Sequence, residues 1–175
     1  MDLESLSVLW HRLYGVMDMF KKWKPYLFYI GLSEAVGLLS GWLSREGRRI
    51  YPNIAAQMPL APPGWVFPVV WVILYALMGY AAARVYNAPA GSVRNWALNL
   101  FFCQLVVNFF WSPIFFNLDA YGLAFFWLLL LLSLVAAMTY FFWKVDKKAA
   151  LFQIPYLLWL LFAAYLNYGV WKLNS

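Results

Sequence analysis

The side chains best suited to binding chemistry are aromatic residues that recur four positions apart. Phe67, Trp71 and Tyr75 follow a double proline at 62–63, and residues at this spacing lie on one face of a helix. The double proline cannot lie inside a helix, so the helix should begin directly after it. The pattern predicts an aromatic wall, although ordinary packing in a helix bundle would account for each aromatic residue taken alone.

Amide side chains at membrane depth form a second face. Gln104, Asn108 and Trp111 are spaced four and three apart in an otherwise apolar stretch. Polar groups that cannot reach water must find partners inside the protein. We therefore expect this face to point into the helix bundle.

A third face lies near the C-terminus. Trp159, Ala163 and Leu166 place a tryptophan beside a small residue, which leaves room for a flat molecule. Leu166, Tyr168 and Lys172 also fit the loose pattern proposed for cholesterol contact, which many membrane helices match by chance.

Glu34 is the one acidic residue deep within an apolar stretch. An ionisable group there is costly and marks a functional candidate facing the bundle interior, unless it is protonated or hydrogen-bonded to a neighbouring helix. The sequence contains few other residues of the types that carry out conventional catalysis. His11 is the sole histidine and Cys103 the sole cysteine, so we predict no catalytic residue, no metal site and no intrachain disulfide.

Composition places all these faces in a membrane. The chain has 175 residues, of which 65% are hydrophobic and 11% charged, and its mean hydropathy is +0.67. Such values exclude an ordinary soluble domain. The net charge of +6 gathers between the apolar stretches, which indicates membrane orientation and lipid contact rather than nucleic-acid binding.

We predict an all-α integral membrane protein, a bundle of five transmembrane helices with a long Pro-rich loop between the first two. Residues 1–24 form an N-terminal extension with the pattern of an interfacial amphipathic helix, and residues 25–174 form the membrane domain. Gly37 and Gly41 are spaced for close helix contact, either within the bundle or between subunits. The expected spans are 25–43, 65–86, 93–116, 123–143 and 149–171, and the fourth, a leucine-rich run, should face lipid.

Five spans place the termini on opposite sides of the membrane. Nine Lys and Arg residues fall on the N-terminal side and four on the other, so the N-terminus should be cytoplasmic. The long loop would then lie outside. No mitochondrial feature is evident, which favours a bacterial plasma membrane.

Three motifs in order resemble the translocator protein family, also called tryptophan-rich sensory proteins or peripheral benzodiazepine receptors. They are PPGWVFPVVWVILYALMGY at 62–80, NFFWSPIFF at 108–116 and PYLLWLLFAAYLNYGVW at 155–171. The resemblance covers roughly residues 31–174. It implies a five-helix bundle, usually a homodimer, with a ligand pocket beneath the first long loop.

Members of this family bind porphyrins such as haem and protoporphyrin IX, synthetic benzodiazepine-type ligands and, in animals, cholesterol. The resemblance therefore implies a membrane receptor or sensor that binds porphyrins or similar flat hydrophobic ligands and is involved in their transport, with no required cofactor. The alternatives are a sterol- or lipid-binding protein and an enzyme that degrades porphyrin with light and oxygen. The implied ligand contacts are Tyr51, Trp71, Asn108, Trp111, Trp159, Ala163 and Leu166, with Leu166, Tyr168 and Lys172 in the sterol motif.

The chain departs from the family pattern in the long loop. Ile50-Tyr51 stands where members commonly have a Trp-Tyr pair. A loop tryptophan is implicated in the light-driven breakdown of protoporphyrin IX by some bacterial members. Its absence makes binding the better expectation than catalysis.

Overall fold

The structure, a computed structural model, describes the backbone of residues 3–47 and 60–174. In the stretch before Lys22 it describes only one side chain, that of Trp10. The long elements within these ranges are all α-helices, and the described residues contain no β-strand. The helices are α1 (Leu3–Leu43), α3 (Val66–Tyr86), α4 (Ser92–Phe116), α5 (Tyr121–Val145), α6 (Lys147–Leu151) and α7 (Ile154–Leu173).

The prediction of five membrane spans is confirmed. Five segments are long and apolar enough to cross a bilayer, namely Lys22–Leu43, Val66–Tyr86, Ser92–Phe116, Tyr121–Val145 and Lys147–Leu173. Each agrees with the expected span to within about four residues. Most of the loop expected between the first two spans falls in residues 48–59, outside the described ranges.

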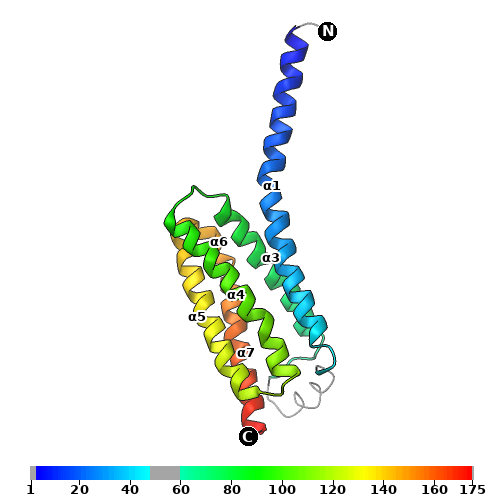
Figure 1. The fold of residues 1–175 in the computed structure, drawn as a ribbon, viewed down its shortest axis with the longest axis vertical. Coiled ribbons are helices and arrows are strands. Elements are labelled where there is room, and N and C mark those ends of the chain that lie inside the picture. The colour runs from blue at the N-terminus through cyan, green and yellow to red at the C-terminus, as the bar shows by residue number, and fades with distance from the viewer. Residues whose placement is uncertain (1–2, 48–59, 175) are drawn as a thin grey trace.

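Helix α1 is longer than the sequence pattern indicated. It runs unbroken through Pro25, so the expected N-terminal extension and the first span form one helix. Its first half projects beyond the end of the bundle (Figure 1). The expected position of this half on the membrane surface stays a prediction.

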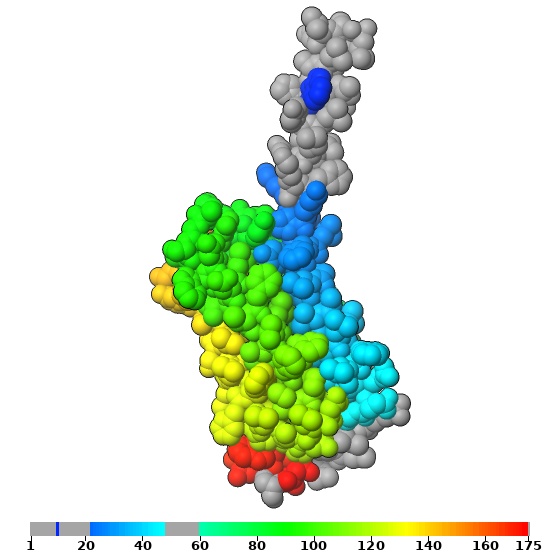
Figure 2. All heavy atoms as spheres, viewed as in Figure 1, coloured from blue at the N-terminus to red at the C-terminus, as the bar shows by residue number. Residues whose placement is uncertain are grey.

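The spans are arranged in a ring. Helix α1 packs along α3 and α4, α4 packs along α5, α5 packs along α7, and α7 returns to α3. The pairs α1–α3 and α4–α5 have the longest contacts (Figure 1). In the space-filling view, α4 and α5 cover much of one face, with the second half of α1 beside α4 (Figure 2).

Helix α5 shows how the apolar core is built. Leu128, Leu131, Val135, Met138 and Phe142 recur every three or four residues, and all are buried. The opposite face of the same helix is exposed, as the residues between them show. The expectation of a lipid-facing helix therefore holds for one face only, because the other face packs on α4 and α7.

The fifth span is not one continuous helix. Pro155 lacks the amide hydrogen that would bond to the carbonyl of Leu151, and its ring crowds that carbonyl. The chain makes a turn at 152–153 between α6 and α7. The Asp146 side chain caps α6 by accepting hydrogen bonds from the backbone amides of Lys148 and Ala149. It also forms an ion pair with Arg84 of α3 at 2.7 Å.

Two glycines let α1 and α3 approach closely. A Cβ added to Gly79 would overlap the backbone at Tyr29 and Ile30, and one added to Gly37 would overlap the Tyr75 ring. Gly37 is thus used for packing inside the bundle. By contrast, a Cβ on Gly31 would meet no atom within 4 Å.

A candidate ligand-binding site

A cavity of about 610 Å³ lies between α1, α3 and α4, at the end of the bundle where α1 ends and α3 begins. Leu38, Trp42 and Val72 line it and are also exposed on the outside, so the cavity reaches the surface between α1 and α3. The lining residues are Glu34, Gly37, Leu38, Ser40, Gly41, Trp42, Arg45, Gly64, Phe67, Pro68, Trp71, Val72, Tyr75, Asn108, Trp111, Ser112 and Phe116.

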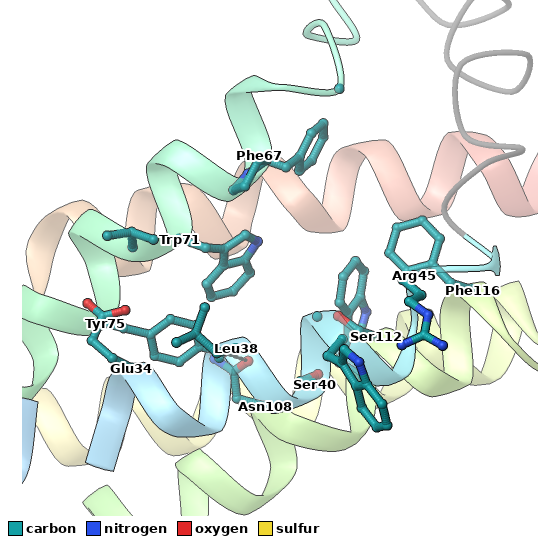
Figure 3. A pocket seen from close by; sticks show the side chains of 17 residues that line it. Glu34, Leu38, Ser40, Arg45, Phe67, Trp71, Tyr75, Asn108, Ser112 and Phe116 are labelled. Atoms are coloured by element: carbon teal, nitrogen blue, oxygen red, sulfur yellow. Dashed lines mark hydrogen bonds between the residues drawn. The ribbon is translucent and has the colours of Figure 1, made fainter. Parts of the chain in front are cut away.

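The aromatic wall predicted from the spacing is present. Phe67, Trp71 and Tyr75 all line the cavity from α3 (Figure 3). The Trp71 and Tyr75 rings lie 5.4 Å apart between centroids and are tilted by 31°. Helix periodicity alone places these side chains on one face, because successive residues at this spacing are about one turn apart.

A buried hydrogen-bond chain forms the floor behind this wall. Tyr75 Oη donates to Asn108 Oδ1 at 2.8 Å, and Asn108 Nδ2 donates to Tyr156 Oη. Tyr156 Oη in turn donates to Gln104 Oε1 at 3.1 Å. The expected inward-facing amides of α4 are thus confirmed, and they join α3, α4 and α7.

Trp111 is held by a second polar contact. Its indole Nε1 donates to Asn167 Oδ1 at 3.3 Å, and Asn167 Nδ2 donates to the Tyr121 carbonyl at 2.8 Å. The Trp111 ring also stacks on Phe115, with centroids 5.2 Å apart. These contacts fix the tryptophan where it borders the cavity.

Glu34 and Arg45 give the cavity two charged ends. Figure 3 shows Glu34 beside Tyr75 at one end and Arg45 at the other. The Arg45 guanidinium lies 4.8 Å from the centre of the Trp42 ring. Among the side chains that the structure describes, no three of His, Cys, Asp and Glu gather as a metal site.

The structure separates the predicted contacts on α7 from this cavity. Trp159, Ala163 and Leu166 are not among its described lining residues. Trp159 lies behind Phe67, with ring centroids 5.7 Å apart in an edge-to-face arrangement. Its indole Nε1 is buried without a hydrogen-bond partner among the described residues. A role for these three residues in ligand contact stays a prediction.

The members of the sterol pattern do not share a face. Leu166 is buried, whereas Tyr168 is exposed and Lys172 reaches back to within 5.9 Å of the Tyr168 ring centre. Leu166 and Tyr168 are two positions apart, which rotates their side chains by about 200° around the helix axis, so they point to opposite sides of α7. Tyr51, the predicted contact in the long loop, lies outside the described residues.

Comparison with known proteins decides the family. The family model described as TspO/MBR family matches residues 29–172, which include the greater part of each of the five spans. The chain belongs to the TspO/MBR family. The resemblance carried by the three motifs is therefore confirmed.

The similar TspO/MBR proteins come from distant organisms. The translocator protein of Ovis aries is 33% identical over 156 residues, which cover 87% of this chain and 92% of that protein. The translocator protein of Homo sapiens is 36% identical over 157 residues, covering 87% and 91%. The tryptophan-rich protein TspO of Chlorobaculum tepidum is 33% identical over 146 residues, covering 83% and 92%.

Sequence reasoning missed one side of the site in this TspO/MBR chain. Helix α1 supplies Gly37, Leu38, Gly41 and Trp42 to the cavity in addition to Glu34, and the turn that follows α1 supplies Arg45. The sequence did contain a signal, because positions 34, 38 and 41 recur at helical spacing on one face. The mixed chemistry of an acid, a leucine and a glycine hid this common face.

Proposed function

We propose that this chain is a membrane receptor that binds porphyrins, such as haem and protoporphyrin IX, and similar flat hydrophobic molecules in the cavity between α1, α3 and α4. The observation that carries the proposal is the aromatic wall of Phe67, Trp71 and Tyr75 along a cavity of about 610 Å³. Small-molecule sites typically measure about 300–1,000 Å³ and are mainly apolar with a few polar groups.

Family membership supports the receptor role. Relatives are named translocator protein and tryptophan-rich sensory protein, and both names suit a membrane protein that detects or passes on a small molecule. Flat aromatic ligands stack favourably on tryptophan and tyrosine rings, at about 0.5–1.5 kcal/mol per ring pair beyond the area buried. We propose a bacterial plasma membrane as the location and a homodimer as the working unit.

Titration of the purified protein with protoporphyrin IX in the dark tests this function. We expect saturable changes in porphyrin absorbance, and Trp111→Ala should weaken binding more than tenfold because the indole borders the cavity. Trp143→Ala is the matched control, since Trp143 is exposed on α5 and does not line the cavity. Unchanged porphyrin affinity in folded Trp111→Ala protein would show that porphyrin does not bind in this cavity.

The same samples separate the alternatives. Loss of porphyrin absorbance under light and oxygen, faster than in empty micelles, would make the protein a porphyrin-degrading enzyme. Absence of saturable binding would direct the search to sterols and other lipids. Trp159→Ala tests α7, because a loss as large as that for Trp111→Ala would extend the ligand contacts to the residues behind Phe67.

A further inference from the structure

Glu34 is the only acidic residue in the five membrane-crossing segments, and it lines the cavity. Its side chain lies beside Tyr75 at the end of the cavity away from Arg45 (Figure 3). A carboxylate at membrane depth is costly unless a positive or hydrogen-bonding group faces it. We therefore expect a positive or hydrogen-bonding group to face the Glu34 carboxylate.

The described part of the chain supplies no such partner. Glu34 makes no hydrogen bond and no ion pair with any residue in the described ranges. Arg84, a basic residue of the neighbouring helix α3, is paired with Asp146 at 2.7 Å. Glu34 is partly buried, and a carboxylate that is partly removed from water is stabilised by a counter-charge, which a ligand in the cavity can supply.

Arg45 lies at the wrong end of the cavity to serve. It follows the last residue of α1, Leu43, by two positions, and Figure 3 shows it at the end of the cavity opposite Glu34. Arg45 also lies beside Glu46, with Nε and Oε1 3.4 Å apart. The cavity thus has an anionic inner end and a cationic outer end.

We propose that Glu34 is the counter-ion for a cationic group of the ligand, so that this cavity prefers flat apolar molecules carrying a protonated amine. The Trp71 and Tyr75 rings line the same cavity and strengthen the preference, because the electron-rich faces of aromatic rings attract ammonium groups. The inference rests on the proposed function only in assigning the ligand to the same cavity. It adds a second class of ligand, cationic amines, whose charge is opposite to that of the propionate groups of porphyrins.

Two fluorescent probes of equal shape isolate the charge. 1-Pyrenemethylamine is protonated at neutral pH, and 1-pyrenemethanol is its neutral counterpart with the same four fused rings. We expect the wild-type protein to bind the amine at least tenfold more tightly than the alcohol, measured by energy transfer from tryptophan. Glu34→Gln should abolish this preference, because it keeps the size of the side chain and removes the charge.

Control variants keep the test specific. Glu46→Gln removes a carboxylate that does not line the cavity, so it should retain the tenfold preference. Glu34→Asp keeps the charge and should retain part of the preference. Equal binding of amine and alcohol by the wild type would overturn the inference, and so would a preference that survives in folded Glu34→Gln protein.

Protoporphyrin IX separates this inference from the proposed function. Glu34→Gln should bind protoporphyrin IX at least as well as the wild type, because the porphyrin carries carboxylates. If the wild type binds no porphyrin but prefers the amine, the porphyrin proposal fails and the counter-ion role stands. If it binds porphyrin and shows no amine preference, the counter-ion role alone fails.

Discussion

At the scale of single residues, Asn108 carries the most connections. Its amide accepts from Tyr75 on α3 and donates to Tyr156 on α7, so one side chain of α4 satisfies two buried hydroxyl groups. Such a network is favourable only while every member has a partner. The wall of the cavity therefore depends on a residue that lies mostly behind it.

Asn108→Ala should lower the free energy of unfolding by about 1–3 kcal/mol, because it leaves buried hydroxyl groups without a partner. Denaturation in detergent, followed by circular dichroism, measures the change. Asn99→Ala is the matched control, since Asn99 is exposed on the same helix. Equal stability of the two variants would show that the network contributes nothing to the fold.

At the scale of elements, the contact between α1 and α3 decides the shape of the cavity. Gly79 brings the two backbones together, and Gly37 accommodates the Tyr75 ring. Ser40 adds a hydrogen bond from α1 to the Phe109 carbonyl of α4 at 2.7 Å. These contacts hold the face of α1 that bears Glu34 and Leu38 opposite the aromatic wall, across the cavity.

Gly37→Ala should displace the Tyr75 ring and narrow the cavity, at a cost of about 1–3 kcal/mol typical of overpacking. Porphyrin affinity should fall together with the melting temperature. Gly31→Ala on the same helix should leave both unchanged or slightly improve stability, because its new methyl group meets no neighbour. Loss of neither property in Gly37→Ala would contradict the packing described for α1 and α3.

At the scale of the whole molecule, both ends of the bundle pair basic residues with aromatic rings. Lys147 Nζ lies 5.6 Å from the Trp143 ring centre at the end near α6, and Lys172 Nζ lies 5.8 Å from the Trp171 ring centre at the other. Such residues are enriched where a membrane meets water. They bound the apolar region that the five spans form.

Labelling of single cysteines tests the orientation. On a Cys103→Ala background, Asn174→Cys should react with a membrane-impermeant maleimide in intact bacterial spheroplasts, because five spans and the excess of basic residues place the C-terminus outside. Ser5→Cys should react only after the membrane is permeabilised. The reverse pattern would invert the proposed topology and place the outer end of the cavity in the cytoplasm.

The sequence by itself determined the number of membrane spans, the aromatic wall and the inward amide face. Each depends on residues within a few turns of one another, so helical periodicity is enough to predict it. Phe67, Trp71 and Tyr75 needed no knowledge of any other helix to share a face. The family, too, could be predicted, because its motifs lie within single spans.

Only the tertiary structure decided which faces meet. It brought the acid of α1 and the arginine that follows this helix into the cavity, and it placed Trp159 behind Phe67. It also assigned Gly37 to Tyr75. These contacts join residues far apart in the chain and depend on how helices rotate and pack against each other, for which one helix's periodicity holds no information.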